Sequence, residues 1–245
     1  MLFTSRKFGV SAMKKIGIIA AMEEEMDAVK QKLEHMETKQ LYGKTFFTGF
    51  LSQKPCILVK SGIGKVNAAH TAQLMIDHFS PSCIINVGSA GALNYDLNYL
   101  DIIISTACIQ FDFDLTVFGR KPGELPELGQ YLKADSHLIE LTKQAIMQTD
   151  SCHRIITGII ATGDQFINDP VIKQSLYNQF QAQCDEMEGA AIAQVCTLCQ
   201  LPFVIIRSIT DKPNTKEKVD FYDYLEQASL RCAQFLEKVA QLIEY

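Results

Sequence analysis

The chain has 245 residues, of which 47% are hydrophobic and 21% are charged, and its formal net charge at pH 7 is -5. This composition is typical of a folded globular protein and excludes a largely disordered chain. The acidic balance, with no basic stripe in any segment, argues against nucleic acid as a partner, because phosphate binding depends on clustered Lys and Arg. No membrane partner is expected either, because the longest apolar runs are too short to span a bilayer.

The first twelve residues lack the apolar segment of a secretory signal, and Met13 stands directly before the first strand pattern. We therefore expect residues 1–12 to be a dispensable extension or a misplaced start, and residues 13–245 to form a single domain.

The 8 cysteines lie mostly inside apolar runs, which favours reduced, buried side chains in a cytoplasmic protein over a disulfide framework. Cys196 and Cys199 form one C-x-x-C pair, but no second pair follows at zinc spacing, so no metal site is predicted.

Short β-branched runs alternate along the chain with longer amphipathic segments. Strands are predicted at residues 15–20, 45–51, 56–62, 83–89, 101–109, 154–162 and 203–209. Helices are predicted at residues 23–36, 65–79, 135–148, 170–180, 188–200 and 220–245, the fourth with Asp169 as N-cap and Pro170 in its first turn. Several strands are apolar on both faces, as in a sheet covered on each side. The order predicts a single α/β domain, with a central mixed and twisted β-sheet flanked by helices in three layers.

Ligands of such sheets bind at the carboxyl ends of strands. Polar or Gly-rich segments follow the predicted strands at AAMEEE (20–25), KSGIGK (60–65), NVGSAGAL (86–93), IATGDQFI (160–167) and RSITD (207–211), and EMEG (186–189) precedes a helix. Each segment alone is explained by a tight turn or by acids at a helix N-terminus. Three carboxylate groups gathered at the ends of one sheet favour a binding site.

Seven blocks in order resemble one family: IGIIAAMEEE (16–25), KSGIGKVNAA (60–69), INVGSAGAL (85–93), FDLTVFG (113–119), GDQFI (163–167), DEMEGAAIA (185–193) and RSITD (207–211). The pattern is similar to the nucleoside phosphorylase/nucleosidase fold and, within it, to the bacterial 5′-methylthioadenosine/S-adenosylhomocysteine nucleosidases. These enzymes hydrolyse the N-glycosidic bond of adenine nucleosides that carry a 5′-thioether, with no metal or organic cofactor. The resemblance implies such an activity here, in the methionine salvage of the cytoplasm.

The resemblance implies three catalytic carboxylates. Glu25 corresponds to the general base that activates water at the anomeric carbon. Glu188 corresponds to the acid that accepts hydrogen bonds from the ribose hydroxyls. Asp211 corresponds to the acid that protonates or hydrogen-bonds adenine N7, and burial is expected to raise its pKa for this purpose.

The same resemblance implies a set of substrate-binding residues. Phe166 would stack on adenine, backbone groups of Ile167 would read its Watson–Crick edge, and Met187 would pack against the sugar. Glu186 would support the ribose side, and Arg207 and Thr210 would support the acids. The remaining expected pocket residues are Met22, Ile63, Ser89, Ala90, Gly91 and Phe221.

A homodimer is also implied, because Leu115, Phe118 and Pro126 match the segment that reaches into the neighbouring subunit's pocket near the 5′ substituent. Arg120 departs from the aromatic residue usual in this segment. It would either favour a charged tail, such as the carboxylate of homocysteine, or point to solvent.

Three alternatives remain open. A phosphorylase on the same fold would use phosphate, but it needs arginines where this chain has glutamates after its first strand. A nucleoside-binding protein would have kept the fold without catalysis. An aminodeoxyfutalosine nucleosidase would differ only in its 5′ pocket.

Overall fold

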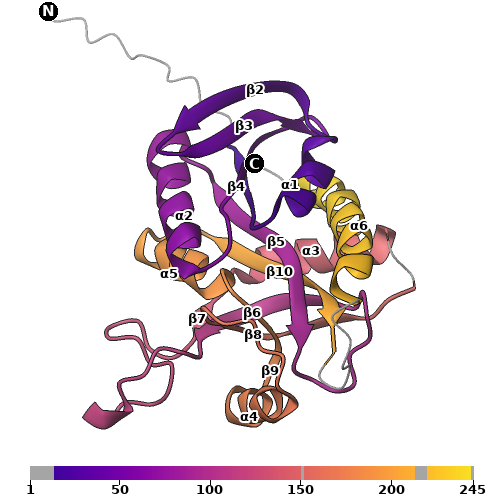
Figure 1. Ribbon diagram of the computed structural model, residues 1–245. Helices are drawn as coiled ribbons and strands as arrows, with labels where there is room; N and C mark the ends of the chain where they lie inside the picture. Colours follow the sequence, from indigo (N-terminus) through magenta and orange to yellow (C-terminus); the bar gives the residue numbers. More distant parts are fainter. Residues whose placement is uncertain (1–13, 150–151, 213–219, 244–245) are drawn as a thin grey trace, which may run out of the picture.

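A mixed ten-stranded β-sheet forms the centre of the structure, a computed structural model that describes residues 14–149, 152–212 and 220–243 (Figure 1). The strands are β1 Ile16–Ala20, β2 Glu34–Leu41, β3 Lys44–Leu51, β4 Lys54–Lys60, β5 Cys83–Ala92, β6 Ile102–Gln110, β7 Leu132–Lys133, β8 Ile155–Thr162, β9 Ala182–Glu186 and β10 Phe203–Asp211. The helices are α1 Glu23–Lys30, α2 Lys65–Phe79, α3 Ser136–Thr149, α4 Pro170–Phe180, α5 Gly189–Leu198 and α6 Asp220–Leu242, with a 3-10 turn, η1, at Thr116–Phe118. The seven predicted strands and six predicted helices all occur, and the predicted extension 1–12 lies outside the described residues.

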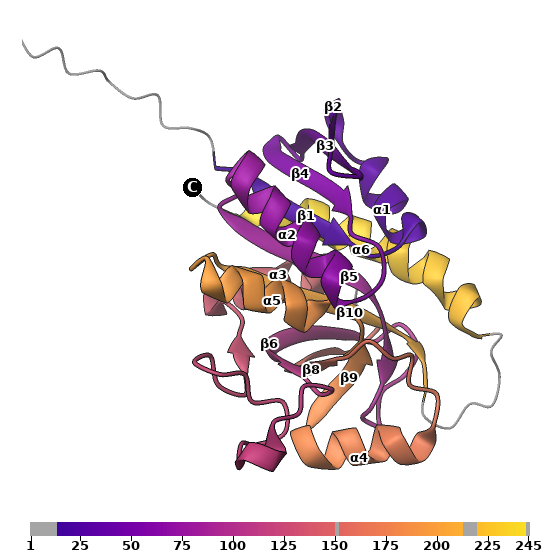
Figure 2. The ribbon, with the colours of Figure 1, turned by 60° about the vertical axis from the view of Figure 1, so that its left-hand side comes forward.

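Strand β5 joins the two halves of the sheet. It pairs in parallel with β1 and β10, and antiparallel with β9. Beyond β10 the order continues through β6 and β8 to β9, so these strands and β5 form a closed circuit. On the other side, β1, β4, β3 and β2 extend from β5 as an open sheet (Figure 2). The closure was not predicted from the sequence.

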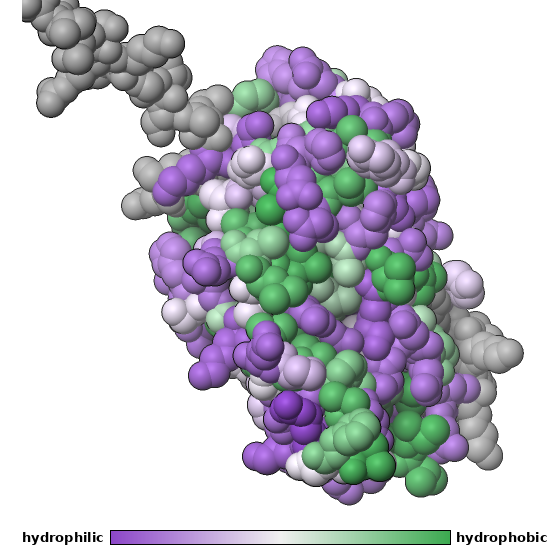
Figure 3. Space-filling view, turned by 90° about the vertical axis from the view of Figure 1, so that its left-hand side faces the viewer, coloured by the Kyte–Doolittle hydropathy of each residue, from purple (hydrophilic) through white to green (hydrophobic). Residues whose placement is uncertain are grey.

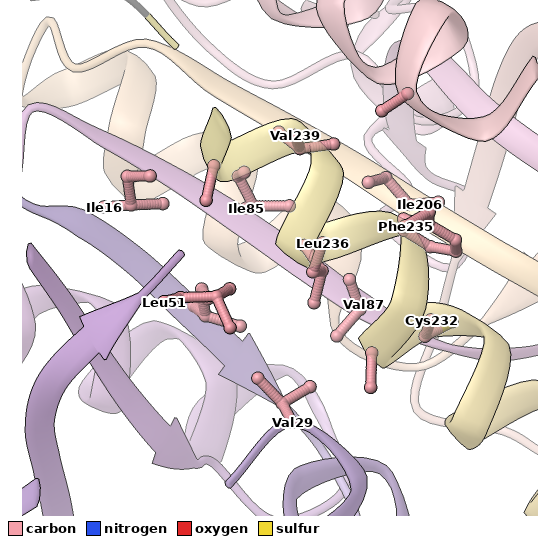
Figure 4. Close-up of a cluster of buried hydrophobic side chains, with 14 of the residues drawn as sticks. Ile16, Val29, Leu51, Ile85, Val87, Ile206, Cys232, Phe235, Leu236 and Val239 are labelled. Atoms are coloured by element: carbon pink, nitrogen blue, oxygen red, sulfur yellow. The ribbon is translucent and has the colours of Figure 1, made fainter. Parts of the chain in front are cut away.

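Two helical layers cover the sheet, as predicted. Helices α1, α3 and α6 pack on one face, and their side chains form a cluster with strand residues such as Ile18 and Ile206 (Figure 4). Helices α2 and α5 pack on the opposite face, where they meet Ile19 and Ile205. Successive residues of one strand therefore enter opposite cores, which explains why β1 and β10 are apolar throughout.

Helix α4 packs on a third, smaller cluster. Its Leu176 and Phe180 meet Ala161 of β8 and Ala182 of β9 there. Its start follows the sequence prediction. Asp169 is the N-cap, its carboxylate accepts a hydrogen bond from the Val171 N–H at 2.7 Å, and Pro170 occupies the first turn.

The predicted helix over residues 23–36 is wrong in its second half. Helix α1 ends at Lys30, and the residues that follow form the strand β2, whose side chains are almost all exposed. Because β2 lies at the edge of the sheet and faces solvent on both sides, its sequence carries no apolar alternation. Strand β9 was also missed, because its acidic residues Asp185 and Glu186 are buried against cations from other elements.

Candidate active site

A pocket lies where residues from six elements converge. It is lined by residues that follow β1, β4, β8 and β9, and by the last residues of β5 and β10: Ala21, Met22, Glu25, Ile63, Ser89, Ala90, Gly91, Gln165, Phe166, Ile167, Asp185, Glu186, Met187, Glu188 and Asp211. Phe166 is 64% exposed and Ile63 is 53% exposed, so two large apolar side chains stand open to solvent at this pocket. Exposed apolar side chains beside buried acids are typical of a site for an amphipathic small molecule.

Glu25 is buried in the first turn of α1 and accepts four hydrogen bonds. Its Oε2 accepts from the backbone N–H groups of Ala21 and Met22 at 3.0 and 3.1 Å. Its Oε1 accepts from the N–H and the hydroxyl of Ser89 at 2.9 and 3.1 Å. The carboxylate is therefore fixed between the helix N-terminus and β5. The two glutamates before it, Glu23 and Glu24, are exposed.

Arg207, only 1% exposed in β10, anchors the acids behind the pocket. Its Nη2 donates to Glu186 and, at 2.7 Å, to the Asn86 Oδ1. The same nitrogen lies 3.6 Å from the Glu188 Oε2. Burial opposes its charge, yet the carboxylates of Glu186 and Glu188 raise the pKa of Arg207 above its ordinary value.

Glu186 fixes the turn that follows β9. Its Oε2 accepts from the N–H groups of Glu188 and Gly189 at 3.0 and 2.7 Å, and its Oε1 accepts from the hydroxyl of Thr162. The backbone is thereby held in the course that brings Met187 and Glu188 to the pocket.

Glu188 is buried but less strongly paired than Glu186. Its Oε1 accepts from the Gly64 N–H at 2.9 Å, just before α2. Burial raises the pKa of Glu188 to about 7; the carboxylates of Glu186 and Glu25 add to the shift, and Arg207 and the Gly64 N–H oppose it. The group therefore titrates near neutral pH.

Asp211 lines the pocket from the last position of β10. Its strand pairs with β5 through an irregularity that sets Ile209 opposite Ala90 and Asp211 opposite Gly91. The extra residue, Thr210, forms a bulge that re-aims the strand end. The Asp211 Oδ2 lies 2.5 Å from the Nζ of Lys173, so a buried ammonium from α4 stands behind this acid.

Asp185 is the second acid beside this ammonium. Its Oδ1 lies 3.8 Å from the same Lys173 nitrogen and has no hydrogen-bond partner among the described atoms. Burial raises the pKa of Asp185 to about 8; the Lys173 ammonium opposes this shift, and the carboxylates of Asp211 and Glu186 add to it.

Two glycines of β5 make room for the charged side chains. A Cβ at Gly88 would lie 2.7 Å from the Arg207 Nη1 and 3.0 Å from the Glu25 Oε1. A Cβ at Gly91 would lie within 2.9 Å of Asp211, Lys173 and Asp185. Any larger residue at either position would displace a side chain of the site.

Most of the residues predicted for the site meet in this pocket. These are Met22, Glu25, Ile63, Ser89, Ala90, Gly91, Phe166, Ile167, Glu186, Met187, Glu188 and Asp211. Arg207 and Thr210 do not line it but are buried directly behind it in β10. The side chain of Phe221 lies outside the described residues.

Leu115, Phe118 and Pro126 lie away from this pocket in the segment 111–131, which stands out from the body in Figures 1 and 2. Phe118 is 77% exposed. Arg120 points to the surface, where its Nη1 pairs with the Glu124 Oε1 at 2.9 Å inside the same segment.

Sequence reasoning missed Lys173, and it left Ala21, Gln165 and Asp185 without a role. In the sequence, Lys173 is one lysine within a predicted helix, and the packing of α4 turns it inward. A charged residue at such a position is normally read as exposed.

A family model described as the phosphorylase superfamily matches residues 15–241. The 5′-methylthioadenosine/S-adenosylhomocysteine nucleosidase of Bacillus cereus (strain G9842) is 40% identical over 228 residues, which are 93% of this chain and 98% of that protein. The chain belongs to this nucleosidase family. The resemblance and the fold class predicted from the sequence are thereby confirmed.

Solved structures of relatives match the whole fold. The nucleosidase of the same name from Neisseria meningitidis, in complex with methylthio-immucillin-A, superposes with a TM-score of 0.90 at 32% identity, covering 94% of this chain and 100% of that one. The futalosine hydrolase of Helicobacter pylori strain 26695 superposes with a TM-score of 0.88 at 31% identity, covering 94% of this chain and 99% of that one.

Within the described ranges, His, Cys, Asp and Glu side chains form no group of three or more that is arranged to hold a metal ion. In the same part of the chain, no helix combines the length and the apolar character needed to cross a membrane. Six of the cysteines are buried, as predicted.

Replacement Glu188→Gln is expected to remove a pH-dependent loss of stability. The folded-state pKa of about 7 lies above the value of about 4.3 expected for an unfolded chain. Between these values the native state binds more protons, so the stabilisation is complete below the unfolded pKa and is lost as the pH rises through the folded one. Urea titrations should show the wild type losing about 1 kcal/mol per pH unit relative to the variant inside this window. Parallel pH profiles would contradict the assignment.

Proposed function

We propose that this protein hydrolyses the N-glycosidic bond of 5′-methylthioadenosine and S-adenosylhomocysteine and releases adenine. The observation that carries the proposal is the meeting of Glu25, Glu188 and Asp211, distant in sequence, around one pocket with apolar walls. Family membership supports the same reaction class. The bond to adenine breaks more easily when the purine gains a proton and the sugar's developing positive charge is stabilised by nearby anions.

Glu25 is proposed to activate the attacking water. Four donors fix its carboxylate, so it would act without first reorganising. The Arg207 Nη1 and the Glu25 Oε1 both approach the space above Gly88, where no side chain intervenes. That nitrogen is buried and has no hydrogen-bond partner among the described atoms, which suits it to hold a buried water beside Glu25.

Glu188 and Met187 are proposed to hold the ribose. A carboxylate can accept hydrogen bonds from neighbouring hydroxyls, and the Gly64 N–H binds only Oε1 of Glu188, while Oε2 lies 3.6 Å from the Arg207 Nη2. Glu186 supports this side without direct contact to the sugar, because its Oε2 accepts from Arg207 and from backbone N–H groups and its Oε1 accepts from the Thr162 hydroxyl.

Adenine is proposed to lie between Phe166 and the Asp211 end of the pocket. Phe166 offers an exposed aromatic face for stacking, and Ile167 is 4% exposed beside it, with its backbone available to the purine edge. The Asp211 carboxyl group would donate a hydrogen bond to N7 of the adenine. As the C–N electron pair passes into the purine, the Asp211 O–H bond breaks and the N7–H bond forms.

A phosphorylase is disfavoured by the charges of the pocket. Glu25 presents a carboxylate to the pocket, while Arg207 and Lys173 are engaged by acidic side chains. A phosphate entering beside Glu25 would be repelled. Retention of all three acids likewise argues against a binding protein that has lost catalysis.

A futalosine-type nucleoside is a second candidate substrate. The observation that favours it is the similarity to the Helicobacter pylori futalosine hydrolase across the whole chain. The two candidates share the adenine and ribose ends of the pocket and differ in the 5′ substituent.

A homodimer is proposed to complete the 5′ end of the pocket. Exposed hydrophobic side chains occur on α2, α5 and η1: Val66 is 80% exposed, Leu198 63%, Val117 85% and Phe118 77%. Figure 3 shows hydrophobic residues gathered on the side of the molecule that carries α2 and α5. Apolar side chains gathered on one face mark an association surface. Leu115, Phe118 and Pro126 of a second copy would then line the 5′ pocket.

The proposed setting is the cytoplasm, where thiols stay reduced. There the reaction would serve methionine salvage by clearing thioether nucleosides.

Incubation of the protein with each nucleoside in phosphate-free buffer, followed by chromatography for adenine, tests the reaction. We expect adenine to appear from the 5′-thioether nucleosides without added phosphate. A requirement for phosphate would indicate a phosphorylase, release only from a 6-amino futalosine would select the second candidate, and binding without release would indicate a non-catalytic protein.

Asp211→Asn is expected to lower kcat by about 10²–10⁴-fold, because the amide cannot deliver a proton to N7. Binding of the nucleoside should remain measurable by calorimetry. Asp27→Asn, which alters a half-exposed carboxylate of α1, is the matched control and should leave kcat unchanged. Near-normal turnover in the Asp211 variant would remove its role in base departure.

Phe118→Ser is expected to weaken the dimer and to raise KM for thioether nucleosides by about tenfold, as is usual for a central interface aromatic. Sedimentation velocity and steady-state kinetics measure the two effects. The control Tyr42→Ser changes another aromatic residue, 74% exposed and next to the edge strand β2. Unchanged sedimentation and KM in the Phe118 variant would contradict the proposed role of η1.

A further inference from the structure

Lys173 is a buried lysine at the back of the pocket that the reaction described above does not use. It lies in α4 and is only 1% exposed. Removing an ammonium from water costs several kcal/mol unless it is well paired. Its closest carboxylate is Asp211, at 2.5 Å, and Asp185 follows at 3.8 Å. Its main partner is therefore the acid that faces the pocket.

The backbone brings these charges together across three adjacent strands. Asp211 of β10 lies opposite Gly91 of β5, and Gly91 lies opposite Asp185 of β9. A Cβ at Gly91 would come within 2.7 Å of the Lys173 Nζ. The ammonium thus occupies the space that the missing side chain of Gly91 leaves between the two carboxylates.

The position of Lys173 is set independently of the pocket. The Lys173 N–H donates to the Asp169 carbonyl at 3.0 Å in the first turn of α4. Leu176 and Phe180 hold the same helix on the third core. Because α4 is anchored in this way, the ammonium is presented to Asp211 in a fixed place.

Asp211 keeps access to the pocket while it is held from behind. Its hydrogen bond from Lys173 involves only Oδ2, and its side chain is 20% exposed, against 8% for Asp185. One side of the carboxyl group therefore meets the ammonium, and the group still lines the pocket.

We propose that Lys173 is a positioning residue for departure of the base: it fixes the Asp211 carboxyl at the purine end of the pocket, and Asp185 is the second acid beside the ammonium. The inference rests on the proposed function, because it assigns the partner of the acid that meets N7. When the Asp211 O–H bond breaks and N7–H forms, a carboxylate remains on Asp211. The ammonium stabilises that carboxylate, so it favours the transition state more than the bound substrate. Asp211 regains a proton from solvent after adenine has left.

Three variants test the proposal: Lys173→Met, the double variant Lys173→Met/Asp185→Asn, and the surface control Lys32→Met, whose lysine pairs with Glu237 at 3.1 Å. The single variant leaves Asp185 buried without a cation and can lose stability for that reason alone. The double variant removes both ionisable groups, those of Lys173 and Asp185, and keeps the side-chain volumes similar. It therefore separates a structural role from a positioning role.

We expect the double variant to unfold at a temperature near that of the wild type, with kcat for 5′-methylthioadenosine lowered at least about tenfold and KM changed by less than about threefold. The surface control should match the wild type in both constants. Recovery of kcat in the double variant would show that Lys173 only neutralises Asp185, and would overturn the proposal.

Binding of adenine and of 7-deazaadenine, measured by calorimetry, gives a readout that does not depend on turnover. The wild type should prefer adenine, because only adenine offers N7 as an acceptor, and both Asp211→Asn and the double variant should lose most of this preference. An unchanged preference in the double variant would overturn the proposal. If the wild type released no adenine from any nucleoside, the proposed function would fall, and the binding ratio would still decide whether Lys173 positions Asp211.

Discussion

The buried ion pair between Arg207 and Glu186 is the interaction on which the site depends. Both side chains are buried, and both oxygens of Glu186 accept hydrogen bonds, so loss of either partner would leave a buried charge without its counter-ion. The arginine connects β10 to Asn86 in β5, and the glutamate connects β9 to the N-terminus of α5. The buried ion pair that Glu186 of the CDEMEG stretch (residues 184–189) makes thus holds β5, β9, β10 and the start of α5 in one arrangement. Glu188 is carried to the pocket as a consequence.

The same stretch explains how acidic residues can precede an apolar helix. Each buried acid faces a cation or a donor from another element: the Lys173 ammonium at 3.8 Å for Asp185, Arg207 for Glu186, and the Gly64 N–H for Glu188. The strengths of these contacts differ. Glu186 is fully engaged, whereas burial leaves Asp185 and Glu188 with raised pKa values of about 8 and about 7. One acid therefore serves as a fixed anchor, and its neighbours remain able to change protonation state near neutral pH.

Much of the fold and of the pocket could be predicted from the sequence, for physical reasons that differ between segments. Strands such as β1 and β10 are buried on both faces, so their continuous apolar character is visible in the sequence. The segments that form the pocket were indicated by their place at strand ends, and the individual residues were implied by the resemblance to the nucleosidase family. The strand β2 could not be found, because a solvent-exposed edge imposes no pattern on its side chains. Lys173 could not be found either, because its burial depends on Asp211, Gly91 and Asp185, which come from three other elements.

The closed circuit of β5, β10, β6, β8 and β9 bears on how two copies can meet. Closure leaves this half of the sheet without a free edge, apart from the short β7, so the open half ends at β2. That strand carries Glu34, Glu37 and Lys39, and its pairing with β3 is irregular near its start. Charges and irregular pairing at an edge discourage another chain from adding a strand. Continuous sheets running through two molecules are thereby disfavoured, and helical faces are left as the surfaces through which copies can associate.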